Sequence, residues 1–282
     1  MKFFAVTCLA VVIFAGYASA EVTGHFMMFD NDYTEVDESS EGDFTSYLQG
    51  GVLRLCFTGV DVNKIDIRYY DSLATMLLAL EKGDIDYLNI PRFVARYLLE
   101  NNDALTVKGF SWWPIQQGAD TLNFAFLENN AELVKKFNNA LADMKKDGTL
   151  AIIEKTYADN YGLTEQPAVS FENFADAESI TVALTGDLPP VDYVDASGEP
   201  EGFNVAVLAE IGRRLHVNIR TIQVESGARL AALTSGRADV IFWFHGNMAR
   251  KDNKLLFIEK PKGILVSEPY YAYNEFYFIG KR

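Results

Sequence analysis

The sequence predicts an α/β protein of two lobes, each a mixed, mostly parallel sheet flanked by helices, with a ligand cleft between them. Residues 180–243 alternate apolar strand-like segments with amphipathic helices, and this alternation through short loops is typical of parallel sheets. Residues 77–89, LLALEKGDIDYLN, also echo residues 230–242, LAALTSGRADVIF. The echo indicates two lobes of similar construction, and a cleft between lobes is the usual place for a small ligand.

The segment 180–243 predicts its elements in a clear order. Val205, Leu208 and Ile211 recur at the helical period after Gly202-Phe203 and form one apolar stripe. The second helix stops at a glycine, which suits a left-handed cap. We expect strands at 180–186, 218–224 and 238–243 and helices at 203–215 and 228–236. An open sheet of this kind holds ligands at the carboxyl ends of its strands.

The remaining elements follow from shorter apolar patterns and from turn residues. We expect strands at 25–30, 65–71, 84–90 and 121–127, helices at 72–83, 91–102, 131–146 and 150–157, a strand within 44–59, and strand-like segments at 263–271 and 275–280. The acidic residues 31–43 predict a solvated loop, and residues 163–179, which include Pro167, predict a linker.

The first 20 residues have the pattern of a secretory signal peptide. Lys2 precedes an apolar run at 3–15, and Ala18-Ser19-Ala20 has the small-x-small form of a cleavage site. We therefore expect cleavage after Ala20 and a periplasmic protein without direct membrane insertion, with a retained N-terminal anchor as the alternative. A chain without further long apolar runs is expected to be a soluble monomer.

Charge and chemistry argue against several functional classes. The chain carries 39 acidic and 25 basic residues, a net charge of −14, so nucleic acid is an improbable partner because it requires clustered Lys and Arg. Cys56 is the one cysteine after the predicted signal peptide, and its apolar surroundings in the sequence predict a buried thiol. The three histidines show no metal-ligand spacing. We expect no enzyme activity, no metal and no cofactor.

Four segments together resemble the type II periplasmic solute-binding proteins, in particular the bacterial extracellular solute-binding proteins of family 3, which serve ABC importers of amino acids. The opening strand, proline-rich turn and Gly-Phe helix at 180–215 are similar to the start of that family, and 230–242 to its helix-glycine-aspartate-strand segment. SEPYY at 267–271 resembles its Ser-acidic-Pro-Tyr motif, and 127–162 resembles its C-terminal end.

The order of these segments differs from the family, because the C-terminal pattern precedes the N-terminal one. The resemblance implies a circular permutation, with a truncated tandem fusion as the alternative. The expected parts are a signal peptide at 1–20, a second-lobe-like domain at 21–115 and a first-lobe-like domain at 116–282, the last divided into 116–162, a linker at 163–179, and 180–282. We then expect one covalent crossing near 110–121 and chain ends that meet at the hinge.

The resemblance also implies a set of ligand-binding residues in the first lobe. They follow its first and third strands and are Asp187, Leu188, Tyr193, Trp243, Phe244, His245 and Asn247. Arg250 is the nearest match to the arginine that holds a ligand carboxylate, although its spacing is off by one. A solvated loop charge is the alternative for Arg250, and strand alternation directs either Trp243 or Phe244 into the core.

The second lobe contributes Thr58, Gly59 and Asp61 at a helix start, where backbone N–H groups bind polar groups. Near the position where the family has an acidic residue for an ammonium group, this chain has the neutral Asn89 instead. The implied function is capture of a small polar ligand, amino-acid-like, by hinge closure and its delivery to the membrane permease of an ABC importer. The alternatives are a sensing or protein-docking module with a degenerate cleft, and a dehydratase or lytic enzyme on the same fold.

Overall fold

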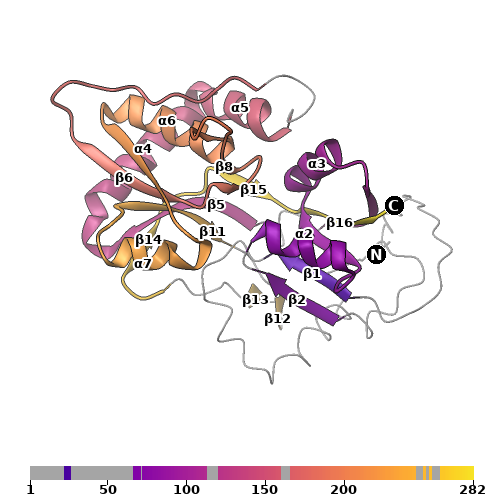
Figure 1. Ribbon diagram of the computed structural model, residues 1–282. Helices are drawn as coiled ribbons and strands as arrows, with labels where there is room; N and C mark the ends of the chain where they lie inside the picture. The colour runs from indigo at the N-terminus through magenta and orange to yellow at the C-terminus, as the bar shows by residue number, and fades with distance from the viewer. Residues whose placement is uncertain are drawn as a thin grey trace, which may run out of the picture.

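The computed structural model describes residues 22–26, 66–70, 72–112, 120–159, 166–245, 250–251, 254–255 and 261–282. Within these residues the chain forms two sheets, each flanked by helices (Figure 1). The predicted class, an α/β protein with two lobes built on mixed sheets, is confirmed.

The larger lobe contains a six-stranded sheet in the order β10-β6-β11-β5-β14, with β15 also on β5. Its strands are β5 (Asp120–Leu127), β6 (Ser179–Leu184), β10 (Asn218–Gln223), β11 (Val240–His245), β14 (Ile264–Val266) and β15 (Tyr271–Tyr273). β10, β6 and β11 run parallel, as predicted for residues 180–243. β5 runs antiparallel to β11, β14 and β15.

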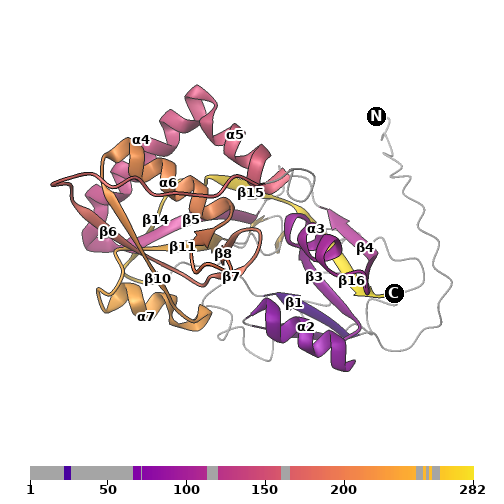
Figure 2. The ribbon, with the colours of Figure 1, turned by 45° about the horizontal axis from the view of Figure 1, so that its top comes forward.

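Helices cover both faces of the larger sheet (Figures 1 and 2). They are α4 (Ala131–Asp147), α5 (Thr149–Glu154), α6 (Phe203–Leu215) and α7 (Arg229–Thr234). Because side chains alternate along a strand, Phe242 joins the core under α4 and α6, whereas Ile241 joins the core under α7. Both faces of β11 are therefore buried, and this explains its unbroken run of apolar residues.

The smaller lobe repeats this plan with a five-stranded sheet in the order β2-β1-β3-β16-β4. Its elements are β1 (Val22–Phe26), β2 (Asp66–Tyr70), α2 (Leu73–Lys82), β3 (Tyr87–Pro91), α3 (Arg92–Asn101), β4 (Leu105–Trp112) and β16 (Glu275–Lys281). β1 is parallel to β2 and β3, and β16 is antiparallel to β3 and β4. The two sheets therefore share three parallel strands followed by an antiparallel one.

The strands that the structure describes place two crossings between the lobes. β4 lies in the smaller sheet and β5 in the larger, so one crossing lies between Trp112 and Asp120. The other runs through Asn274, between β15 in the larger sheet and β16 in the smaller. The prediction of a single covalent crossing is therefore wrong. The assignment of 275–282 to the first-lobe-like domain also needs correction, because β16 forms its ladder with β3 and β4.

The first and last strands lie in the same sheet, one on each side of β3. Leu88 has Gly24 as its neighbour on one side and Ile279 on the other. Phe276, nearer the crossing, lies opposite Pro91. β16 therefore ends, and β1 begins, at the end of the strands farthest from the crossing. The predicted meeting of the chain ends at the hinge is wrong.

Several short elements lie outside the two main sheets. A three-stranded sheet contains β7 (Asp187–Leu188), β8 (Asp192–Val194) and β9 (Pro200–Glu201), and β12 (Arg250–Lys251) pairs with β13 (Lys254–Leu255). The remaining turns are η4 (Glu128–Asn130), the π-helical η5 (Lys155–Asp159) and η6 (Ser226–Ala228).

The part of the predicted linker that the structure describes, residues 166–178, contains no helix or strand and lies against the larger lobe. The Asn218 side chain accepts from Phe174 N at 2.7 Å and donates to Phe174 O at 3.0 Å. The Glu201 carboxylate accepts from Val169 N at 3.0 Å. These bonds hold the linker along the surface of the lobe.

The start of α6 depends on a glycine with no room for a side chain. Gly202 has φ +110°, and a Cβ there would lie 2.6 Å from Val191 O and 2.7 Å from Pro190 O. Gly198 also has a positive φ, +90°, but nothing lies within 4 Å of its Cβ position. A side chain would strain the backbone at either position, but only at Gly202 would its Cβ also clash with backbone atoms.

We expect Gly202→Ala to lower the free energy of unfolding by about 3–5 kcal/mol, since backbone atoms cannot yield as a flexible side chain does. Gly198→Ala should cost about 1–2 kcal/mol, the contribution of the positive φ alone. Urea unfolding of both variants measures the difference, and equal losses would contradict the steric explanation.

Candidate functional site

Polar side chains gather where β6 ends and the β7–β8 loop begins. Asp192, only 1% exposed, accepts hydrogen bonds from three directions. Thr185 Oγ1 donates to Asp192 Oδ1 at 2.8 Å, Gly186 N donates to the same oxygen at 3.1 Å, and Asn204 Nδ2 donates to Asp192 Oδ2 at 3.3 Å. Asp192 thereby fastens the loop to the end of β6 and to the first turn of α6.

The same network reaches the segment that leads to the crossing. The Tyr270 hydroxyl donates to Asn204 Oδ1 at 2.7 Å, and both side chains are buried. Burial and then the nearby Asp192 charge raise the pKa of Tyr270 well above its usual value, so the phenol remains a donor. Position 270 therefore couples the start of α6 to β15.

The charge of a buried arginine partly offsets the effect of burial on Asp192. Burial raises the pKa of Asp192, and the charge of Arg229 is the first effect that opposes the rise. Arg229 begins α7 and is 4% exposed. Since both oxygens of Asp192 are already occupied by fixed donors, the carboxylate is suited to holding the loop and not to general acid or base chemistry.

The Ser-Glu-Pro-Tyr-Tyr segment is held to β5 by its first residue. Ser267 Oγ accepts from Phe124 N at 2.9 Å and donates to Glu268 O at 2.8 Å. Ser267 O accepts from Asn123 Nδ2 at 2.8 Å. The motif thus fixes the chain just before the crossing, which is a structural role.

The structure brings three of the predicted ligand residues together. Asp187 and Tyr193 are partners across the β7–β8 ladder, and Leu188 opposes Asp192. Asp187 is exposed, Tyr193 is half-buried and Leu188 is only 3% exposed. Burial followed by the Glu201 charge raises the pKa of Tyr193, which therefore stays neutral.

Trp243 lies in the hydrophobic core and not on an exposed surface. It is 5% exposed and belongs to the apolar cluster under α7. Its buried indole Nε1–H has no hydrogen-bond partner within the described ranges of the chain. Phe244 and His245 continue β11 opposite Leu122 and Thr121, but their side chains lie outside the described residues.

The remaining predicted site residues are located only in part. Arg250 lies in β12 opposite Leu255, and its side chain lies outside the described residues. Asn89 lies in β3 and is half-buried, and its Oδ1 has no hydrogen-bond partner among the described residues. Four predicted residues fall outside the described residues altogether, namely Thr58, Gly59, Asp61 and Asn247.

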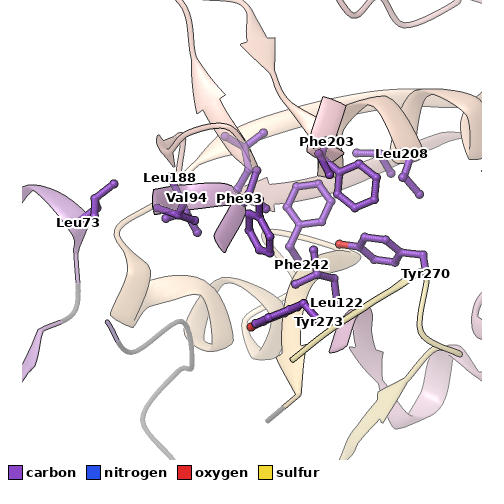
Figure 3. Close-up of a cluster of buried hydrophobic side chains, with 14 of the residues drawn as sticks. Leu73, Phe93, Val94, Leu122, Leu188, Phe203, Leu208, Phe242, Tyr270 and Tyr273 are labelled. Atoms are coloured by element: carbon purple, nitrogen blue, oxygen red, sulfur yellow. The ribbon is translucent and has the colours of Figure 1, made fainter. Parts of the chain in front are cut away.

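Apolar side chains from both lobes meet beside this loop. Leu188 of β7 belongs to one continuous apolar cluster with Leu73 of α2 and Val94 of α3, which are 4% and 0% exposed (Figure 3). The Phe93 ring lies edge-on to Tyr271 and Tyr273, with ring centroids 5.7 and 5.2 Å apart. The facing surfaces that the structure describes are therefore largely apolar and aromatic.

Sequence reasoning did not find the smaller lobe's share of this surface. Leu73 and Phe93 lie in the first turns of the helices that follow β2 and β3, and the carboxyl ends of parallel strands point toward the ligand side of a sheet. The available signal was their position, because an apolar residue in the first turn of such a helix is a candidate for contact with the opposite lobe.

A cavity of about 320 Å³ lies elsewhere on the larger lobe. It is lined by the amino ends of β6 and β11 and the first turn of α4, namely by Asn129, Asn130, Glu132, Leu133, Lys136, Glu178, Ser179, Ile180, Leu215, Val217 and Asp239. It therefore lies at the edge of the sheet opposite the predicted site.

Two further features are absent from the described residues. Among the described residues, no group of three His, Cys, Asp or Glu side chains is arranged to hold a metal ion. The described helices include none whose length and hydropathy would suit a membrane span.

Part of the larger lobe is similar to known proteins. Residues 180–274 match the family of bacterial extracellular solute-binding proteins, family 3. The L-cystine-binding protein TcyJ of Escherichia coli K12 is 35% identical over 99 residues, which are 34% of this chain and 35% of TcyJ. TcyJ of E. coli O6:H1 matches equally. The chain thus spans about a third of the length of these curated relatives.

Solved structures of low sequence similarity also match. The ligand-binding component of an ABC-type import system from Staphylococcus aureus has a TM-score of 0.41 and 9% identity, covering 93% of this chain and 66% of that one. The GluR0 ligand-binding core of Nostoc punctiforme, in complex with L-glutamate, has a TM-score of 0.37 and 9% identity, covering 93% and 85%.

The family match covers β6 to β15, and these strands make up most of the larger sheet. It includes the Asp192 network and the three predicted ligand residues that the structure brings together. Residues 180–274 are thus similar to the bacterial extracellular solute-binding proteins of family 3.

Proposed function

We propose that this chain is an exported solute-binding protein that captures an amino-acid-like ligand by closure of its two lobes and delivers it to an ABC importer. The observation that carries the proposal is the family match of residues 180–274, supported by 35% identity to an L-cystine-binding protein over 99 residues. Export through cleavage after Ala20 and function as a monomer belong to the same proposal.

The geometry of the two sheets supports lobe closure. Each sheet has three parallel strands, and its fourth strand comes from the chain that crosses from the other lobe. The two crossings lie side by side, because β16 and β4 are paired through Glu275 and Trp112 at the crossing end. Such a pair of strands is suited to act as a hinge.

The proposed site combines Asp187, Leu188 and Tyr193 of the larger lobe with Arg250 as the carboxylate ligand. In the smaller lobe we propose Asn89, whose buried Oδ1 is unpartnered among the described residues and can accept from a ligand ammonium group. Thr58, Gly59, Asp61, Phe244, His245 and Asn247 remain proposed ligand residues. Trp243 is proposed only as a support for the site, because it lies in the core.

We also propose that the chain is a circular permutation of the family. The second-lobe-like part at 21–115 precedes the family C-terminal part at 116–162, the linker follows, and the family N-terminal part begins at 180. The placement of β1 and β16 on either side of β3 supports this order, because a break between two neighbouring positions needs little rearrangement.

One observation favours a second candidate function. Leu188, a predicted ligand contact, is 3% exposed and packs in a cluster with Leu73 and Val94 of the other lobe. A cleft closed on itself in this way would suit a protein-docking or sensing module. No contact of the described residues favours the dehydratase or lytic alternative.

A thermal-shift screen of the purified protein tests the first function against the second. L-cystine or another amino acid at about 100 times its dissociation constant should add about 2.7 kcal/mol of stability, a rise of roughly 5–10 °C in Tm. The panel should include sugars and organic acids as controls. The absence of a rise with every amino acid would contradict the proposed function and favour the docking module.

Arg250 provides a sharper test of the ligand class. Arg250→Ala should weaken binding of a carboxylate ligand by about 2–4 kcal/mol, since a bidentate charge pair is lost. Arg237→Ala is the matched control, because Arg237 is an exposed arginine in the turn before β11. Isothermal titration with equal affinities for the wild type and Arg250→Ala would assign Arg250 to the solvated surface.

A further inference from the structure

The start of α3 makes contacts in both lobes. α3 follows directly after β3, at the end of the smaller sheet nearest the crossing. Arg92 Nε lies 2.9 Å from Glu275 Oε2, a contact within the smaller lobe. Arg92 Nη2 also lies 3.6 Å from Asp159 Oδ1 of the larger lobe.

A second arginine reaches the same point of the larger lobe. Arg96, one turn further along α3, donates from Nη1 to the backbone carbonyl of Asp159. Asp159 ends η5, the last turn of the helical segment that begins with α5. Its carboxylate and its carbonyl thus each face one arginine of α3.

An aromatic contact lies beside the ionic one. The Phe93 ring meets Tyr271 at 5.7 Å and 75°. Tyr271 in turn meets Phe203, at the start of α6, at 5.2 Å and 65°. Both are edge-to-face arrangements, the geometry that aromatic quadrupoles favour.

We propose that these residues form an inter-lobe clasp that holds the two lobes together in the absence of ligand. The clasp consists of Arg92, Phe93 and Arg96 of the smaller lobe and Asp159 and Tyr271 of the larger lobe. It differs from closure driven by a ligand, because none of its contacts requires one.

The two parts of the clasp differ in strength. The Arg92 and Asp159 side chains are 39% and 43% exposed, so water and salt screen their attraction. Phe93 is 5% exposed and its contacts are dry. The clasp therefore biases the lobes toward closure without locking them.

The consequence for binding rests on the proposed function. If ligand is held by the closed form, its apparent affinity scales with the fraction of molecules already closed. Loss of the clasp should then weaken binding by the factor by which the closed fraction falls, with no ligand contact removed.

The test measures the distance between the lobes without ligand. Fluorophores for single-molecule energy transfer are placed at Glu81→Cys in α2 and Ile152→Cys in α5, two exposed positions, with Cys8 and Cys56 replaced by serine. Asp159→Asn should lower the closed-to-open ratio roughly two- to five-fold, as expected for a half-exposed ion pair. Raising the salt concentration should have the same effect on the wild type but little on Asp159→Asn.

Matched variants separate the clasp from general destabilisation. Glu275→Gln removes the Arg92 partner within the smaller lobe, so the ratio should not fall. Tyr271→Ala should lower it more than Asp159→Asn does, whereas Tyr277→Ala, in β16 of the smaller sheet, should leave it unchanged. Unaltered distances in both Asp159→Asn and Tyr271→Ala, or a wild type that is mostly open, would overturn the proposal.

Titration of the same variants with L-cystine keeps the two proposals distinct. A shift in distances without ligand, together with no binding of L-cystine, would support the clasp and contradict capture of this ligand. Binding of L-cystine with equal affinity to the wild type and Asp159→Asn, despite a lower closed fraction, would overturn the link between the clasp and affinity.

Discussion

The exchange of antiparallel strands between the lobes is the constraint on which the rest of the structure depends. β5 completes the larger sheet after the chain has left the smaller one, and β16 completes the smaller sheet after the chain has left the larger one. Each sheet thus contains one internal strand, β5 or β16, that directly follows a crossing. Neither sheet is complete without that strand. The parallel strands of both sheets consequently present their carboxyl ends to the same region between the lobes, where ligands of α/β sheets bind.

Much of the fold follows from local sequence rules. The strand-helix alternation of 180–243 predicted the parallel strands β6, β10 and β11, and the glycine after each leucine-rich segment predicted the end of α2 at Gly83, which has φ +81°. The crossing was mispredicted because residues 275–280 read equally well as a strand of either sheet. Which sheet takes β16 depends on pairing with β3 and β4, a long-range choice that strand propensity does not contain.

The site was harder to predict than the fold, for a physical reason. Asp187, Leu188 and Tyr193 were predicted as ligand residues from the family resemblance, because they follow the first strand of the larger lobe. The sequence did not separate exposed Asp187 from buried Leu188, whose burial depends on residues of the other lobe such as Leu73 and Val94. The role of Asp192 was also missed, because its donors at Thr185, Gly186 and Asn204 are brought together only by the turn and by α6. Contacts between lobes are the part of the site that local patterns do not encode.

The placement of the chain ends bears on how a permuted chain could keep a working hinge. β1 begins and β16 ends at the edge of the smaller sheet away from the crossing, while Phe276 and Pro91 are neighbours nearer to it. A break at that far edge leaves both crossings covalent, so closure does not depend on the pairing of two free ends. In the proposed permutation the compensating join would lie in the linker on the larger lobe, where Asn218 and Glu201 hold residues 166–178 to the surface. Under this proposal both changes would lie away from the two crossings, so a change in the order of the chain would leave the proposed hinge intact.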